Sequence, residues 1–228
     1  MKYIRVNDGK EKMREKIKRL FEELQPMATS KSLNIISSRL YKELPKDDEE
    51  FISLCNEFVE SEDWILYQMM TMWIKKRSTT YEMKYFKTYE RWLYDYTTHL
   101  GACDQYCYRV LNPMIEKFPE LFNEVRKWAN SDKIYVKRAS VVCLLKSTKT
   151  FIVNVPFEEV KEISDILIND SHIHIQKGIG WLLKYAYLSY PEEVINYLND
   201  NLNIMSRTTF RYALEKMPEE LKKEIMAK

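Results

Sequence analysis

The segment IQKGIGWLLK, residues 175–184, carries the pattern that decides the fold of this chain. Its apolar residues Ile175, Ile179 and Leu182 recur at the spacing of one helix face. A second set of residues recurs at i, i+3, i+7 and i+10 on the opposite face, and it consists of His174, Lys177, Trp181 and Lys184. Gly178 and Gly180 flank the apolar stripe, where small residues let another backbone or a ligand come close. We therefore predict a two-faced helix over 172–187.

The composition of the whole chain agrees with an all-α class. Only 4 Gly and 7 Pro occur in 228 residues, which leaves little material for the tight turns of a sheet protein. Leu, Lys, Glu, Met, Arg and Tyr fill the intervals between them. The length suits a single domain, or a single array of repeats that shares one core.

Helical periodicity recurs along the chain in pieces of ordinary helix length. Prolines 26, 45, 119, 156, 191 and 218 lie near the proposed helix starts, where a missing N–H is tolerated. The predicted helices span 9–24, 29–43, 48–61, 63–77, 81–96, 103–117, 119–130, 133–147, 156–168, 172–187, 191–199, 206–216 and 218–227.

A pair of predicted helices recurs about every 35–40 residues from Asp48 onward. This period predicts antiparallel helical hairpins stacked as HEAT-like repeats, with one concave face lined by the second helix of each pair. The charged segment 1–45 is expected to cap the array as an N-terminal helical element. The whole of 1–228 would then form a single HEAT-like-repeat domain.

The formal charge of +2 does not by itself indicate a nucleic-acid-binding protein, so the distribution of charge has to decide. Residues 133–157, 171–191 and 201–214 contain basic residues and no acidic ones. This segregation predicts a basic concave face and double-stranded DNA as the partner. The basic residues in these windows are Lys133, Lys137, Arg138, Lys146, Lys149, Lys177, Lys184, Arg207 and Arg211.

The cysteines Cys55, Cys103, Cys107 and Cys143 form no CxxC pair and fall on mostly apolar helical stretches, as buried free thiols do in a reducing compartment. The chain has no apolar h-region at its start and no long apolar run. We expect a cytoplasmic protein that is not in a membrane, a monomer, and no cofactor. His99, Cys103 and Cys107 could hold a soft metal by their spacing, but no fourth ligand is evident, and we expect no metal.

Two pairs of neighbouring cations stand out. Lys137 and Arg138 follow Tyr135 in the first turns of a helix, where cations oppose the helix dipole, so their placement suggests a compensating anion such as a phosphate. Arg207 and Arg211 repel one another at i and i+4 and suggest the same. The alternative for both pairs is a solvated surface.

Asp104 and Trp181 are the residues with the clearest chemical potential, and each has a structural alternative. Asp104 follows Gly101 at the start of a predicted helix, so it could act as a cap or as a partner of the helix dipole. Trp181 could pack against the next repeat. Spacing alone leaves both alternatives open.

Four ordered motifs carry a resemblance to a known family. They are the CD of GACDQYC (101–107), the KRAS of YVKRASVV (135–142), the QKGIGW of IQKGIGWLLK (175–184) and the RYALEKMP of 211–218. In this order the chain resembles the DNA alkylation repair glycosylases of the AlkD type, a HEAT-like-repeat family. The resemblance covers residues 50–218 and is strongest after residue 100.

The resemblance implies a monofunctional DNA glycosylase that removes N3- or N7-alkylated purines from a duplex without flipping the base into a deep pocket. Asp104 matches the catalytic aspartate, which stabilises positive charge at C1′ and orients the attacking water. Trp181 matches a tryptophan that stabilises the same charge, and Arg138 a backbone-binding arginine with Lys137 beside it. Tyr135, Lys177, Lys184, Arg207 and Arg211 are expected to contact DNA.

Leu100 departs from the family pattern, because many relatives carry Trp four residues before the aspartate. Tyr96, His99 or Tyr135 could take its place. The departure keeps a second hypothesis open, a catalytically silent protein that binds damaged or branched DNA. A helical scaffold with no role on DNA is the third hypothesis, suggested by the near-neutral net charge.

Overall fold

The computed structural model of the chain describes residues 2–25, 27 and 29–227, with side chains from residue 11 onward. Its contacts divide the chain into two compact units, Met1–Tyr85 and Phe86–Lys228. No helix in the described ranges is long and apolar enough to cross a membrane. The prediction of a single domain stays a prediction.

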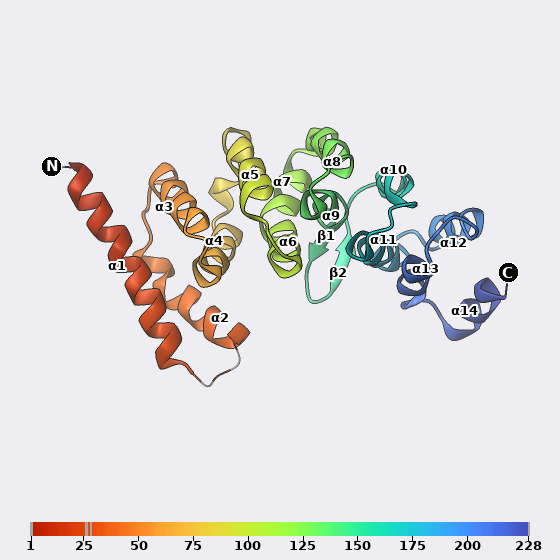
Figure 1. Cartoon of the computed structure of the whole chain (residues 1–228), viewed down its shortest axis with the longest axis horizontal. Coiled ribbons are helices and arrows are strands. Elements are labelled where there is room, and N and C mark those ends of the chain that lie inside the picture. Colours follow the sequence, from red (N-terminus) through yellow and green to blue (C-terminus); the bar gives the residue numbers. More distant parts are fainter. Residues whose placement is uncertain (1, 26, 28, 228) are drawn as a thin grey trace. The chain divides into compact units, whose positions relative to one another are not determined.

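Unit 1 consists of helices. They are α1 (Lys2–Glu23), α2 (Thr29–Leu40), the short η1 (Tyr41–Glu43), α3 (Asp48–Glu60), α4 (Trp64–Lys76) and η2 (Ser78–Thr80), and α5 (Met83–Tyr96) begins at its end. Helices α1 and α2 pack together, as do α3 and α4, and α2 also packs on α4 (Figure 1). Asp47 and Asp63 cap α3 and α4, since their carboxylates accept backbone N–H groups of the first turn.

Unit 2 continues with helices and one small hairpin. Its elements are α6 (Leu100–Tyr106), the π-helical η3 (Cys107–Leu111), α7 (Asn112–Lys117), η4 (Pro119–Leu121), α8 (Phe122–Ala129), α9 (Ile134–Val142), β1 (Leu145–Ser147), β2 (Phe151–Val153), α10 (Phe157–Leu167), α11 (Ile173–Ala186), α12 (Pro191–Asp200), α13 (Arg207–Leu214) and α14 (Glu219–Met226).

The helices of unit 2 stack as hairpins. Within the pairs α8–α9 and α10–α11 the two helices pack on each other, while α9 packs on α11 and α11 on α13 (Figure 1). The first helices of successive pairs begin at residues 48, 83, 122, 157 and 191, at intervals of 35, 39, 35 and 34 residues. The predicted all-α fold of stacked HEAT-like hairpins is confirmed.

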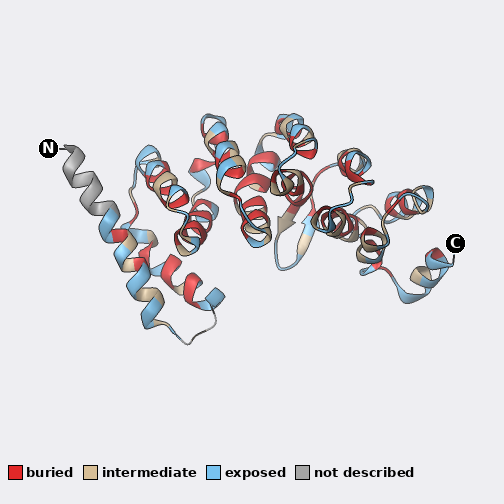
Figure 2. Cartoon of the chain, in the orientation of Figure 1, coloured by how far each residue is buried: buried red, intermediate tan, exposed pale blue. Residues whose placement is uncertain are grey.

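The core lies between the helices of each pair and between neighbouring pairs (Figure 2). Trp73, Trp92 and Trp128 are fully buried. All four cysteines are buried free thiols. Burial raises the pKa of the Cys55, Cys107 and Cys143 thiols above the ordinary value, so these side chains stay protonated.

The predicted helix 133–147 was wrong at its C-terminal end. Helix α9 ends at Val142, and Leu145–Ser147 pairs antiparallel with Phe151–Val153, with Lys146 opposite Ile152. Thr148 N–H donates to the Thr150 carbonyl at 2.7 Å and closes the turn. The apolar run Val141–Leu145 fits a helix and a strand equally well, so its pattern could not locate the change.

The predicted helix 103–117 also differs in detail. It begins at Leu100, is capped by the His99 imidazole, and widens into a π turn at Cys107–Leu111 before α7. Pro113 explains the widening, because proline has no N–H and its ring clashes with the carbonyl four residues earlier in a regular α-helix. Asp104 therefore lies just before an irregular turn.

Candidate functional site

The centre of the candidate site in unit 2 is an ion pair between Asp104 on α6 and Arg138 on α9. The Arg138 guanidinium donates Nε to Asp104 Oδ1 at 2.7 Å and Nη2 to Oδ2 at 3.0 Å. Its Nη1 donates to the backbone carbonyl of His174 on α11. The Arg138 side chain is 5% exposed and that of Asp104 is 19% exposed, so the carboxylate keeps one open edge. Arg138 thereby fixes the direction of the Asp104 carboxylate.

The geometry rules out the capping role for Asp104, because His99 Nδ1 accepts the Ala102 N–H at the start of the helix. Gly178 makes room for the arginine, since a Cβ at this position would lie 3.3 Å from Arg138 Nη1. Burial opposes the charge on Arg138, but hydrogen bonds with Asp104 outweigh it and raise the pKa of Arg138 above its ordinary value. Arg138 is therefore charged at neutral pH.

Tyr135 and His174 form an aromatic pair beside this ion pair. Their rings stack with centroids 6.2 Å apart, and the ring centroid of His172 lies 5.1 Å from that of His174. The pKa of His174 is below its ordinary value because of burial and the electrostatic effects of His172, Arg138 and Lys177, although Asp104 acts in the opposite direction. His174 Nδ1 is buried and has no hydrogen-bond partner among the described residues. The imidazole is therefore uncharged at neutral pH.

Lys137 is paired with a carboxylate of the chain itself. Its Nζ lies 2.9 Å from Asp170 Oδ2, just before α11. Burial works against the charge on Asp170, but hydrogen bonds from the His172 N–H and from Lys137 outweigh it, and the pKa of Asp170 is lowered. The adjacent cations Lys137 and Arg138 thus both have compensating anions within the chain, which is a different source from the phosphate suggested by the sequence.

Trp181 belongs to an aromatic cluster formed with the β-hairpin. Its ring meets the Phe151 ring edge-on at 4.9 Å, and Phe151 also contacts Tyr108 at 5.7 Å and Tyr185 at 5.6 Å. Tyr108 follows Asp104 by one turn and lies within its electrostatic influence, which helps burial to raise the Tyr108 pKa. The cluster therefore connects Trp181 to the segment that carries Asp104.

A cleft of about 460 Å³ between α11 and α13 holds three of the predicted basic residues. Lys177, Arg207 and Arg211 line it, together with Ile173, Thr208, Tyr212 and Glu215. Lys177 Nζ lies 5.9 Å from the Tyr212 ring centroid, and the two arginines make no ion pair or hydrogen bond with the described residues. Lys184 is instead paired with Glu215 at 2.6 Å.

The structure thus brings Asp104, Arg138 and Tyr135 together and gathers Lys177, Arg207 and Arg211 in a separate cleft. Leu100 is half-buried at the first position of α6, one turn before Asp104. No cluster of three metal-binding side chains occurs in the described part of the chain.

Sequence reasoning missed several members of the site. Phe151 lies on a strand that was not expected, and Tyr108 and His174 were not assigned roles. The proximity of His174 to Lys177 and Trp181 on one helix face was the available signal for that histidine. For Phe151 the local sequence gave none.

The arrangement suits chemistry at a positively charged reaction centre. A fixed carboxylate that is partly exposed can stabilise a developing cation and accept a proton from water. Aromatic rings nearby favour a cationic ligand on their faces. The basic cleft provides arginine forks for phosphate.

Comparisons with known proteins agree with this reading. The profile of the DNA alkylation repair enzyme family matches residues 8–217. The fold is similar to that of a protein described as a predicted DNA alkylation repair enzyme from Enterococcus faecalis, with a TM-score of 0.68, 13% identity, and coverage of 93% of this chain and 96% of that one.

The fold is also similar to that of the Pseudomonas fluorescens alkylpurine DNA glycosylase AlkC bound to DNA containing an abasic site analog. The TM-score is 0.61 at 16% identity, and the match covers 97% of this chain but 65% of the AlkC chain. No curated protein matches the sequence significantly. Because the family profile spans nearly the whole sequence, this chain belongs to the DNA alkylation repair enzyme family.

Proposed function

We propose that the protein is a monofunctional DNA glycosylase that excises N3- or N7-alkylated purines from duplex DNA. The observation that carries the proposal is the Asp104 carboxylate, which the buried Arg138 holds by two hydrogen bonds while one edge stays open. A carboxylate held in this way does not need to reorganise when positive charge develops in front of it.

The reaction is a hydrolysis of the N-glycosidic bond. The alkylated base leaves with the bonding electrons and becomes neutral, since alkylation had given it a positive charge. Asp104 stabilises the oxocarbenium character at C1′, orients the water that attacks this carbon, and accepts its proton. Arg138 acts as a positioning residue through Asp104.

Two aromatic groups would favour the cationic base and sugar. Trp181 presents a half-exposed ring on the Phe151 cluster, and the Tyr135–His174 pair lies beside the Asp104–Arg138 ion pair. Electron-rich ring faces attract cations by about 0.5–2 kcal/mol. Tyr96, His99 and Tyr135 were the possible substitutes for the aromatic side chain missing at Leu100. Tyr135 is the one that we propose for this role, because it belongs to the aromatic pair beside the Asp104–Arg138 ion pair.

The DNA backbone is proposed to lie along Lys177, Arg207 and Arg211, which line one cleft and form no ion pair with the residues that the structure describes. Lys137 and Lys184 can join only by exchanging Asp170 and Glu215 for phosphate. Arg138 is buried, so breaking its ion pair with Asp104 would cost free energy by leaving a buried charge without a partner. For this reason we assign Arg138 the role of holding the carboxylate and not that of a phosphate contact.

The test is release of 7-methylguanine or 3-methyladenine from methylated duplex DNA. Asp104→Asn keeps the shape of the side chain and removes its charge, and we expect release to fall by at least about a hundredfold, the size of a general base contribution. Asp165→Asn is the matched control, because Asp165 forms an exposed ion pair with Lys161 on α10 and should leave release unchanged. Full release by Asp104→Asn would overturn the proposed mechanism.

A second candidate is a protein that binds damaged or branched DNA without excision, and the half-buried Leu100 favours it. It predicts salt-dependent binding to DNA and no base release from either the native chain or the Asp165→Asn variant.

A further inference from the structure

Charge is segregated between the helices of unit 1. Helices α2 and α4 contain no Asp or Glu, and the acid-free stretches extend over 24–42 and 64–81. The acidic residues of this unit lie instead on α1, η1 and α3 and in the connections between helices. Unit 1 as a whole has nearly equal numbers of acidic and basic residues, so its composition conceals this separation.

The exposed side of α2 is cationic and rich in hydrogen-bond donors. One stripe of the helix is buried and consists of Ser32, Leu33, Ile36, Ser37 and Leu40. The other side borders an open groove of about 580 Å³ lined by Ser30, Lys31, Asn34, Ile35, Ser38 and Arg39. Among the side chains of unit 1 that the structure describes, Trp64 and Met83 are the large exposed apolar ones, and both lie outside α2.

Lys76 extends this surface onto α4. Its Nζ lies 3.2 Å from both Ser37 Oγ and Ser38 Oγ on α2, and the Tyr41 hydroxyl donates to the Lys76 carbonyl at 3.1 Å. Trp73 Nε1 donates to the Ser37 carbonyl at 3.0 Å and holds the two helices together below it. Burial lowers the pKa of Lys76.

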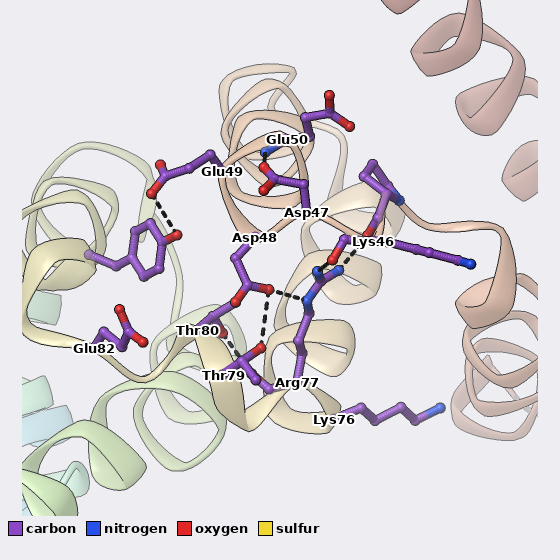
Figure 3. A network of polar contacts seen from close by, with 12 residues as sticks. Lys46, Asp47, Asp48, Glu49, Glu50, Lys76, Arg77, Thr79, Thr80 and Glu82 are labelled. Atoms are coloured by element: carbon purple, nitrogen blue, oxygen red, sulfur yellow. Dashed lines mark hydrogen bonds and ion pairs between the residues drawn. The ribbon is translucent and has the colours of Figure 1, made fainter.

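The neighbouring Arg77 has a different role. Its guanidinium donates to Asp48 Oδ1 and to the carbonyls of Pro45 and Lys46, which ties the start of α3 to the end of α4 (Figure 3). In the same view Lys46 and Lys76 extend away from these contacts (Figure 3). Arg77 is therefore structural, whereas the side chains of Lys46 and Lys76 take no part in tying α3 to α4.

The cations of this surface differ from those of α1 in their partners. Lys31, Arg39, Lys42 and Lys46 form no ion pair with any residue that the structure describes, whereas Lys18 pairs with Asp63 and Arg19 with Glu23. A helix face that presents only cations, hydroxyls and an amide has the chemistry that binds phosphate oxygens. A protein partner would more often be met by large apolar side chains, which α2 does not expose.

We propose that the exposed side of α2, together with Lys76, is a second DNA-binding surface that contacts the phosphodiester backbone of duplex DNA independently of base identity. The inference rests on the proposed function in requiring that the protein binds DNA. It assigns a role to unit 1, for which the sequence motifs gave none.

The test measures the affinity for a labelled duplex at several salt concentrations. In Lys31→Gln/Arg39→Gln we expect weaker binding and a slope of log K against log salt that is smaller in magnitude by about 2, since each lost phosphate contact contributes about 0.9. The matched control Lys18→Gln/Arg19→Gln removes the same charge from the same unit and should leave the slope unchanged. Lys76 is left unchanged in both variants, because its hydrogen bonds to the hydroxyl groups of Ser37 and Ser38 support the packing of α2 on α4.

The outcomes separate this proposal from the proposed function. Equal slopes for the two double variants, with native DNA binding and base release intact, overturn the second surface alone. Loss of affinity in both variants by the same amount also overturns it, because a general charge effect would then explain the result. Absence of DNA binding by the native chain overturns both proposals.

Discussion

Arg138 offers the most direct test of the individual side chains. Its replacement by Met leaves the half-buried Asp104 carboxylate and the His174 carbonyl without their donor, and we expect a loss of about 3–5 kcal/mol in the free energy of unfolding. Urea unfolding followed by circular dichroism measures this. Lys161→Met, at an exposed i,i+4 ion pair, should cost less than about 1 kcal/mol.

The double variant Arg138→Met/Asp104→Asn completes the test of the ion pair. Removing the uncompensated charge should restore part of the lost stability, so the two changes should not be additive. Additive losses would show that Arg138 contributes by packing alone.

His174 predicts a dependence of stability on pH. Its pKa in the folded protein lies below the ordinary value of 6.5, because burial and the electrostatic effects of His172, Arg138 and Lys177 oppose protonation more than the Asp104 carboxylate favours it. The unfolded chain then binds the proton at higher pH than the folded one, so stability should decrease as pH falls below 6.5 and level off below the folded pKa.

The His174→Gln variant should lack this part of the pH dependence. Urea unfolding of the native and variant proteins at a series of pH values gives the difference. A difference that does not change with pH would show that His174 titrates normally.

The individual residues of the candidate site could be found from the sequence, but their contacts could not. Asp104, Arg138 and Trp181 stand out by type and motif, whereas the pairing of Asp104 with Arg138 joins positions 34 residues apart. Lys137 and Arg138 look alike in the sequence as neighbouring cations near a helix start. Only the packing of α9 decides that Arg138 turns inward to Asp104 and Lys137 outward to Asp170.

Among the helices, the contact of α11 with α13 depends on one glycine. A Cβ at Gly180 would lie 2.4 Å from Tyr212 Cβ and 2.6 Å from the Thr209 carbonyl oxygen, so the two helices would have to separate. We expect Gly180→Ala to destabilise the protein by about 2 kcal/mol or more through overpacking. Because Arg207 and Arg211 lie on α13, DNA affinity should fall as well.

Gly101→Ala is the control for this change. A Cβ there meets only the His99 ring at 3.6 Å, and alanine favours a helix, so stability should stay equal or rise by up to about 1 kcal/mol. Thermal unfolding of both variants compares them. Equal stability of the two variants would contradict the close approach of α11 and α13.

Most helices could be predicted because each carries a 3.6-residue period and many begin near a proline. The β-hairpin could not, since the apolar run that leads into β1 continues the period of α9. The π turn was missed for another reason. Pro113 was overlooked as a disturbance within a helix that otherwise has regular apolar spacing.

For the whole molecule, the repeat period predicted the stacked hairpins, because each pair of helices must bury its apolar sides against the next. The near-neutral net charge did not predict the cationic surfaces, because it sums over helices with mostly basic residues and helices with mostly acidic residues. The acid-free stretches of the second half could be predicted from the sequence. The cationic surface on α2 could not, because it depends on the packing of α4 against α2, which brings Lys76 to Ser37.

The burial of the cysteines has a consequence for a protein of this family in its working environment. The electrophiles that methylate DNA also attack sulfur, and they react with the thiolate far faster than with the thiol. All four thiols lie inside the folded chain, and burial holds at least Cys55, Cys107 and Cys143 in the protonated form. The folded chain therefore exposes none of its four thiols to a methylating agent.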